Sequence, residues 1–180
     1  MRENQTFNEM MVHVPLCTHK DPQNVLIVGA ASQNLKNEAL KHQTNVEFVD
    51  LQTLNSKNEK NIDVIILTDI NLDEMVVANI KRVLKDDGLI TFKTESFHKD
   101  EESLKKDLEL VGENFWIAMP FRFGHDTAIL ASKKYHPTAD IILQRSDLLN
   151  DLEYYSTEIH TSSFIFPASQ HRALTGIAKR

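Results

Sequence analysis

The chain has 180 residues, of which 41% are hydrophobic and 26% are charged, and this suits one globular domain with a substantial core. Its formal net charge of −6, with lysines and glutamates interspersed, argues against a nucleic-acid partner, because binding to a phosphate backbone requires clustered cations. The single cysteine, Cys17, excludes an internal disulfide and a zinc site built from cysteines.

The first half of the chain alternates apolar runs with stretches of helical composition. Residues 24–29 form a short apolar run stopped by glycine, which is typical of a strand buried on both faces. Residues 33–42 have helical composition, and residues 46–50 read as a second strand. Residues 63–68 are apolar almost throughout and predict a third strand.

The second half continues this alternation. The spacing predicts a helix over 72–84 that ends at the sequence Asp86-Asp87-Gly88. Its apolar stripe consists of Met75, Val76, Ile80, Val83 and Leu84. The remaining predicted elements are a strand over 89–92, a helix over 99–112 and two closing strands over 115–120 and 127–132.

The order of these elements predicts an α/β fold. Strands that alternate with helices form a mainly parallel sheet with right-handed crossovers. Two closing strands without a helix between them imply an antiparallel pair at one edge of that sheet. Cys17 lies in an apolar segment, where a small buried hydrophobe is favoured over a reactive thiol.

Three stretches of the sequence share their pattern with one enzyme family. Residues 7–19 are similar to the Tyr-His-Glu-Met…His-Val-Pro-Leu…Thr-His segment of spermidine synthases. Residues 84–96 resemble the family's Leu-Lys-x-Asp-Gly…Gln-Thr-Glu-Ser stretch. Residues 152–167 resemble its Tyr-Tyr-Asn…Ile-His-x-Ala-Phe-x-Leu-Pro stretch, and this last pattern is the most specific of the three.

The resemblance implies a Rossmann-like, class I methyltransferase-type sheet in a single domain over residues 1–180, without the family's N-terminal β-domain. It implies decarboxylated S-adenosylmethionine as the co-substrate, with an aminopropyl group transferred to putrescine. The reaction is a direct displacement that needs a carboxylate base and substrates held in line. It requires neither a metal nor a tightly bound cofactor, so no metal ligand is predicted.

The loop after the first strand is the first candidate cofactor contact. Where the family has Gly-Gly-Gly-Asp-Gly-Gly, this chain has Gly29, Ala30, Ala31 and Ser32. The resemblance assigns all four residues to the co-substrate, with Ser32 in place of the carboxylate. A tight strand-to-helix turn explains a single glycine without any ligand and is the favoured explanation.

Asp50 ends the second predicted strand, where the family carries an acid that binds the two ribose hydroxyls. An acid at a strand end is also common without a ligand. Only residues 51–62 separate Asp50 from Asp63. A helix and a further strand need more chain than this, because a crossover alone takes a dozen or more residues. We therefore expect the usual third strand and the adenine-contacting turn to be missing.

The catalytic turn of the family, Asp-Val-Ile-Ile-x-Asp-Ser-Ser-Asp, corresponds to residues 63–71. Thr68 and Asn71 stand at its two acid positions, and neither can act as a base near neutral pH. Asp69 is offset by one residue. It points away from the cleft if the strand continues, and it reaches the cleft if the strand has ended. Asp69 is the candidate base, with Thr68 beside it and Asn71 as a substrate contact.

The segments that bind the amine in the family are matched in part. Asn8 stands where the family has histidine and is assigned to the co-substrate, while Glu9, Tyr154 and Tyr155 are assigned to the amine. Packing of the C-terminal segment explains both tyrosines equally well. Lys93 replaces a glutamine, and its charge would repel a diamine or a sulfonium.

Three readings of the function stay open at this point. The first is an active aminopropyltransferase. The second is a degenerate family member that binds a nucleoside or polyamine without turnover, and the third is a scaffold that pairs through the exposed edge of its second strand. His160 is expected to be structural. The absence of a signal-like segment or membrane span favours a cytoplasmic protein without a membrane partner. The resemblance implies a polyamine or nucleoside as the small-molecule partner, and a homodimer is one option.

Overall fold

The structure is a computed structural model that describes the backbone of residues 2–180 and the side chains from residue 5 onward. Its helices are α1 (Arg2–Thr18), α2 (Gln33–Leu40), α3 (Leu51–Ser56), α4 (Glu74–Val83), α5 (Phe97–Gly112), α6 (Leu143–Asp147), α7 (Thr157–Ser162) and α8 (Ala168–Ala173). Its strands are β1 (Asn24–Gly29), β2 (Asn45–Val49), β3 (Ile62–Thr68), β4 (Leu84–Thr94), β5 (Ile117–Phe123) and β6 (Asp126–Ser132).

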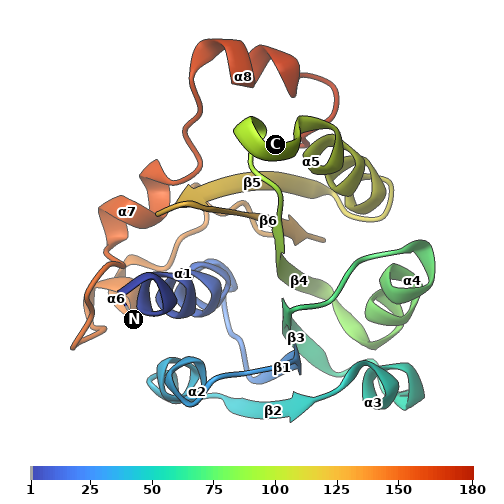
Figure 1. The fold of residues 1–180 in the computed structure, drawn as a ribbon. Coiled ribbons are helices and arrows are strands. Elements are labelled where there is room, and N and C mark those ends of the chain that lie inside the picture. Colours follow the sequence, from blue (N-terminus) through green and yellow to red (C-terminus); the bar gives the residue numbers. More distant parts are fainter. Residues whose placement is uncertain (1) are drawn as a thin grey trace.

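The strands form one sheet in the order β2-β1-β3-β4-β6-β5. β2, β1, β3 and β4 run parallel, and β6 and β5 join as an antiparallel pair at the edge. This confirms the predicted α/β architecture. Helices cover both faces, with α1 and α2 on one side of the sheet and α3, α4 and α5 on the other (Figure 1).

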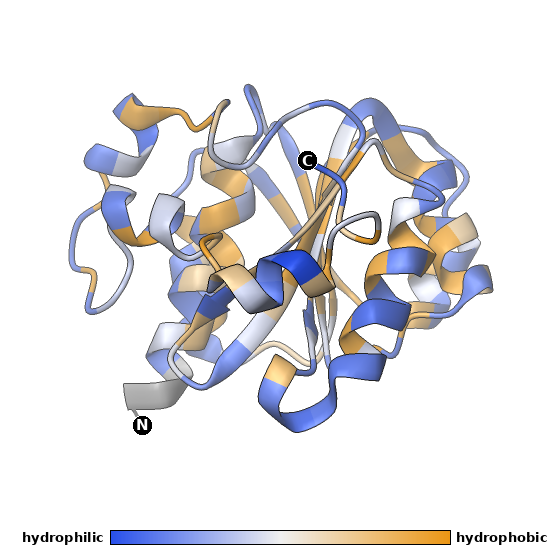
Figure 2. Cartoon of the chain, turned by 90° about the horizontal axis from the view of Figure 1, so that it is seen from above, coloured by the Kyte–Doolittle hydropathy of each residue, from blue (hydrophilic) through white to orange (hydrophobic). Residues whose placement is uncertain are grey.

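The sheet is buried because both of its faces are apolar. In β1, Val25 and Ile27 pack with α1 and α2, whereas Leu26 and Val28 pack with α3 and α4 on the opposite face. Figure 2 shows this sandwich from above, with apolar strands between helices that carry many hydrophilic residues. In the part of the chain that is described, no helix has both the length and the apolar character that a membrane crossing requires.

Cys17 lies near the end of α1 and is fully buried. Burial raises the pKa of its thiol to about 11, so it stays protonated near neutral pH. The prediction of a small buried hydrophobe is confirmed.

Several predicted elements have different boundaries in the structure, most clearly around α4, β4 and β5. α4 begins at Glu74, and its buried stripe is Val76, Val77, Ile80 and Val83. Met75 is 72% exposed, because it lies about 100° around the helix from Val76, outside that stripe. Leu84 does not belong to the helix but is the first residue of β4. It pairs with Ile62 of β3, and the register between the two strands shifts directly after this pair. The predicted strand at 115–120 starts later, leaving Trp116 outside it and 78% exposed.

The short interval between Asp50 and Asp63 holds only the six-residue helix α3 and a connecting loop. As a result, β2 is the last strand on its side of the sheet among residues 2–180. The expectation that the usual third strand is missing is met for this part of the chain. The edge is exposed, and Phe48 on β2 is 37% accessible.

Candidate functional site at the carboxyl edge of the sheet

The carboxyl ends of the parallel strands lie along one edge of the sheet, where open α/β sheets bind their ligands. β1 ends at Gly29, β3 at Thr68 and β4 at Thr94. Gly29 pairs with Thr68, so the loops that follow β1 and β3 start side by side. Most of the predicted site residues follow these strand ends.

Gly29 is required by the contact between β1 and β3. Its φ angle is +107°, and a Cβ atom at this position would lie 1.9 Å from the carbonyl oxygen of Thr68. No other residue type fits such an approach without a shift of the backbone. The tight-turn explanation of this glycine is therefore sufficient, and contact with a ligand remains a prediction.

Thr68 connects the same two loops through its side chain. It is 3% exposed, and its hydroxyl donates a hydrogen bond of 2.6 Å to the carbonyl oxygen of Ala30. The predicted catalytic position is thus occupied by a hydroxyl that faces the backbone. Thr68 can therefore fix the conformation of the loop after β1, but its hydroxyl does not face a substrate and cannot serve as the catalytic base.

Ser32 caps the amino end of α2. Its hydroxyl accepts the backbone N–H of Leu35 at 3.1 Å. Ala30 is exposed and Ala31 is half-buried. The loop therefore presents small side chains and backbone to solvent, which suits close approach of a ligand.

Asp50 plays the same structural role for α3. Its carboxylate accepts the backbone N–H of Thr53 at 2.8 Å, and the side chain is exposed. The hydrogen bonds from Thr53 lower the pKa of Asp50, so it is ionised near neutral pH. The cap acceptor is Oδ1, and contact of this carboxylate with ribose hydroxyls remains a prediction.

Asp69 directly follows the end of β3, and its backbone is left-handed with φ of 53°. Non-glycine residues adopt this conformation rarely, and often at functional sites. Asp69 and Asn71 are exposed and line a cleft of about 520 Å³ between the end of β4, the loop before α4, and α5. Because the strand has ended, Asp69 reaches a cleft, which was one of the two predicted alternatives.

The cleft carries acidic groups from three elements, namely Asp69, Glu95 and Asp107, and it also carries Lys93 and Lys106. Burial raises the pKa of Asp107, which accepts a hydrogen bond of 2.6 Å from the hydroxyl of Thr94. Among the described residues, no cationic side chain lies within 4 Å of Asp69, so its carboxylate is available to a bound cation. Glu95 pairs with Lys99 at 2.9 Å, so the attraction of this lining for amines rests mainly on Asp69.

Lys93 also lines the cleft, but its ammonium group pairs with Asp126 on β6 at 2.9 Å. From the sequence, the charge of this lysine is expected to repel a cationic substrate. A neighbouring carboxylate offsets most of that repulsion, because the pair presents no net charge to a ligand.

Glu9 is fully buried in α1 and does not line the cleft. Its two carboxylate oxygens accept the backbone N–H groups of Glu153, Tyr154 and Tyr155, each at 2.8 Å. Burial opposes ionisation of Glu9, but these hydrogen bonds outweigh it and lower its pKa. Glu9 therefore holds the C-terminal segment, and the structure does not bring it to the predicted amine site.

The two predicted tyrosines lie in different surroundings. Tyr155 is buried in the core, and its hydroxyl contacts Nδ1 of His160 at 2.8 Å. Nε2 of His160 contacts the carbonyl oxygen of Pro137 at 2.9 Å, and burial lowers the pKa of this histidine to about 4. His160 is structural, as expected. Tyr154 is half-buried, and its hydroxyl accepts the N–H of Gly124 in the β5–β6 turn.

Asn8 lies in α1 next to Glu9 and is 3% exposed. Its side-chain nitrogen Nδ2 is buried without a hydrogen-bond partner among the described residues. Buried donors are nearly always paired, so this atom calls for a partner that a ligand or water supplies. The observation fits the predicted contact between Asn8 and the co-substrate.

Comparisons with known proteins agree with this geometry. Residues 4–55 match the family described as the spermine/spermidine synthase domain. The chain is 29% identical over 199 residues to a polyamine aminopropyltransferase of Helicobacter acinonychis. The alignment covers 93% of this chain and 76% of that protein. Its fold superimposes on a spermidine synthase solved with the transition state analogue AdoDATO, with a TM-score of 0.84, 23% identity, and coverage of 94% of this chain and 75% of that one.

The chain is similar to polyamine aminopropyltransferases over most of its length, and its first third matches the spermine/spermidine synthase domain. Its fold also resembles methyltransferases, such as the 1,6-didemethyltoxoflavin-N1-methyltransferase of Burkholderia thailandensis, with a TM-score of 0.55, 18% identity, and coverage of 74% of this chain and 82% of that one. The predicted methyltransferase-type sheet is therefore confirmed.

In this chain, the predicted residues separate into two groups. The carboxyl edge carries Gly29, Ala30, Ala31, Ser32, Asp50, Thr68, Asp69 and Asn71. Glu9 and Tyr155 instead hold the C-terminal segment to the core. The match of Glu9 and Tyr155 to the family pattern is explained by their role in the fold, and contact with a ligand remains a prediction for both.

Asp107 was not identified from the sequence. It lies on α5 between Leu104 and Leu108, which face the core, so the helix places it at the border of the buried stripe. An acidic residue at the border of a helix's buried stripe, facing the end of a strand, is the sequence feature that could have indicated Asp107. Its role at the cleft depends on the packing of α5 against β4.

Proposed function

We propose that this chain transfers an aminopropyl group from decarboxylated S-adenosylmethionine to an amine of the putrescine type. Its resemblance to polyamine aminopropyltransferases over most of its length supports the reaction class. The observation that carries the proposal is the position of Asp69, whose carboxylate lines an acidic cleft at the carboxyl edge of the sheet. A cationic amine is attracted to such a cleft, and a carboxylate is the base that the reaction needs.

In the proposed reaction, the ammonium group of the acceptor first gives a proton to the Asp69 carboxylate. The free electron pair of the amine then attacks the methylene carbon beside the sulfonium. A carbon–nitrogen bond forms as the carbon–sulfur bond breaks, and the sulfur keeps the bonding pair as the neutral thioether of methylthioadenosine. The positive charge moves from sulfur to the new secondary ammonium, so charge is conserved.

The two substrates would occupy different parts of the edge. Asp50 would accept the ribose hydroxyls, and the loop from Gly29 to Ser32 would lie against the ligand. Asn8 would donate from its unpaired Nδ2. Glu95 and Asp107 line the same cleft as Asp69 and would hold the distal ammonium of a diamine, with the substrate ammonium replacing Lys99 at Glu95.

The direct test is to incubate the full chain with both substrates and to measure methylthioadenosine by chromatography. We expect Asp69→Asn to lower kcat by about 10²- to 10³-fold, as loss of a general base does. Asp86→Asn, which changes an exposed acid paired with Lys60, is the matched control and should leave kcat unchanged.

Two outcomes would contradict the proposal. Full activity of the Asp69→Asn variant would place the base elsewhere. No product at high enzyme concentration, together with calorimetric binding of methylthioadenosine, would identify a nucleoside-binding relative without turnover.

We also infer that the protein works in the cytoplasm on small molecules and forms a homodimer. The exposed edge of β2, with its unpaired backbone groups and the partly exposed Phe48, supports self-association. Light scattering should give twice the mass of one chain, and Phe48→Glu should shift the protein to the monomer if β2 forms the contact. A wild-type monomer at micromolar concentration would contradict this inference.

A further inference from the structure

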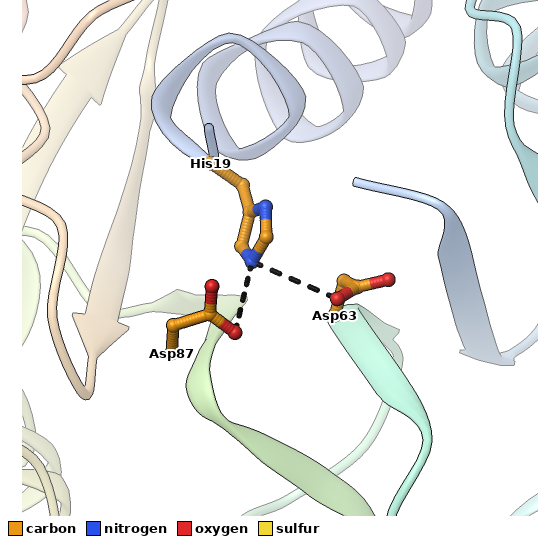
Figure 3. A group of neighbouring side chains, drawn as sticks. All are labelled: His19, Asp63 and Asp87. Carbon is orange, nitrogen blue, oxygen red and sulfur yellow. Dashed lines mark ion pairs between the residues drawn. The ribbon is translucent and has the colours of Figure 1, made fainter. Parts of the chain in front are cut away.

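Three side chains converge at the amino end of the sheet, opposite the carboxyl-edge cleft. His19 follows α1, Asp63 lies near the start of β3, and Asp87 lies in the irregular first part of β4. Figure 3 shows the imidazole pointing between the two carboxylates. Nε2 of His19 lies 3.6 Å from Oδ1 of Asp87 and 3.9 Å from Oδ1 of Asp63. All three donor atoms lie within 4.8 Å of one another.

Nε2 of His19 is a buried polar atom without a hydrogen-bond partner in the described part of the chain. His19 is 1% exposed, so bulk water does not solvate it. Both carboxylate oxygens lie too far away for a direct hydrogen bond, which needs about 2.7–3.2 Å. Native structures rarely leave such an atom unpaired, and an atom or ion between these three groups would resolve it.

In each carboxylate, one oxygen accepts a hydrogen bond from the protein, and the other oxygen faces the space between the three side chains. Oδ2 of Asp63 accepts the backbone N–H of Asn24 at 2.8 Å. Oδ2 of Asp87 accepts the hydroxyl of Tyr135 at 2.9 Å. Support of this kind orients the ligands of metal sites.

The spacing of the donor atoms also fits a bound ion. Two ligands that each lie about 2.1 Å from a zinc ion are roughly 3.4–3.6 Å apart for tetrahedral to trigonal angles. The measured separations of 3.6 and 3.9 Å lie at or slightly above this range. The two carboxylate oxygens lie within 4.8 Å of each other, so both carboxylates would close towards the ion as it binds.

We propose that His19, Asp63 and Asp87 bind one divalent transition-metal ion, with Zn²⁺ as the best-suited ion. One imidazole and two carboxylates match the ligands that Zn²⁺ takes, whereas Mg²⁺ and Ca²⁺ prefer oxygen alone. Water would complete the coordination. The ion would tie the end of α1 to β3 and β4, so its effect is on stability, and the site is independent of the proposed aminopropyl transfer.

Two existing contacts must yield when the ion binds. The ammonium group of Lys85 lies 3.0 Å from Oδ1 of Asp63, but its side chain is 37% exposed and can move into solvent. Nδ1 of His19 accepts the N–H of Asp21 at 3.1 Å. This nitrogen must take the proton when Nε2 binds the metal, and the exposed Asp21 N–H then turns to water.

Competition with Lys85 yields the sharpest test. The full chain is treated with EDTA, dialysed and titrated with Zn²⁺ by calorimetry, and Co²⁺ absorption reports the coordination. We expect one site per chain. His19→Gln and Asp87→Asn should weaken binding at least about tenfold, whereas Asp86→Asn, the neighbouring exposed acid, should not change it. Lys85→Met should tighten binding by about fivefold, because it removes a cation that competes for Asp63.

The Lys85→Met variant keeps the test valid if the buried substitutions disturb folding, because it changes only a partly exposed side chain. Circular dichroism checks each variant. The absence of saturable binding to the wild-type chain would overturn the proposal. Unchanged affinity in Lys85→Met, or wild-type affinity in folded His19→Gln, would place the metal elsewhere and overturn it as well.

Discussion

The carboxylate of Glu9 accepts the backbone N–H of Tyr155 at 2.8 Å, although 146 positions separate the two residues in the sequence. The same carboxylate also accepts the N–H groups of Glu153 and Tyr154. One buried anion thus fastens the C-terminal segment to α1. Glu9 and Tyr155 both match the family pattern in segments predicted to form the amine site.

Glu9→Gln should lower the free energy of unfolding by about 3 kcal/mol. The amide keeps one acceptor oxygen, but its NH₂ group faces backbone donors and leaves them unpaired in the core. Urea denaturation measures the loss. Glu153→Gln changes an exposed acid in the same segment and should alter stability by less than about 0.5 kcal/mol. A Glu9→Gln variant as stable as this control would show that the hydrogen bonds of Glu9 to the C-terminal segment do not stabilise the fold.

The buried pair of Glu38 and His13 should make the protein sensitive to acid. Burial opposes ionisation of Glu38, but hydrogen bonds from His13, Lys41 and Gln5 lower its pKa from 4.5 to about 2. Because the folded pKa is depressed, this stabilisation is present above pH 4.5 and is lost as the pH falls towards 2. Its size is about 3 kcal/mol.

A Glu38→Gln variant should therefore be less stable than the wild type at pH 7 but lose less stability between pH 4.5 and 2. Denaturant titrations at several pH values measure both slopes. Glu158→Gln, an exposed acid in α7, should keep the wild-type slope. Equal slopes for the wild type and Glu38→Gln would show that other groups dominate acid unfolding.

Gly29→Ala should destabilise the protein by more than about 3 kcal/mol or prevent folding. The added methyl group would lie 1.9 Å from the carbonyl oxygen of Thr68, and the φ of +107° is unfavourable for alanine. Gly176→Ala is the control, because its φ is +83° but no atom lies within 4 Å of the new methyl group. That variant should lose only about 1 kcal/mol. Similar losses in both would mean that the close approach to β3 is not decisive.

Two substitutions of Asp50 separate its cap role from ligand binding. Asp50→Ser keeps an acceptor for the N–H of Thr53, whereas Asp50→Ala removes it, so only Ala should lower the melting temperature, by a few degrees. Both remove the carboxylate, and both should weaken methylthioadenosine binding at least about tenfold in calorimetry. Wild-type affinity in the serine variant would restrict Asp50 to capping.

Local sequence signals predicted the strands well. Short apolar runs marked β1 and β3, because a parallel strand is buried on both faces and needs apolar residues throughout. The interval between Asp50 and Asp63 predicted the missing strand, since chain length limits what can be built there. The end of α4 was harder, because Leu84 has the spacing of a helix residue but pairs with Ile62.

The sequence by itself determined the α/β class, the family resemblance and the set of residues at the carboxyl edge, because strand ends and motif spacing are local properties of the chain. The tertiary structure alone decided what each side chain does. It turned Thr68 towards Ala30, buried Glu9 under the C-terminal segment, and brought Asp107 to the cleft with Asp69. It also gathered His19, Asp63 and Asp87, which belong to three separate elements. Contacts between distant segments depend on packing, and no local pattern encodes them.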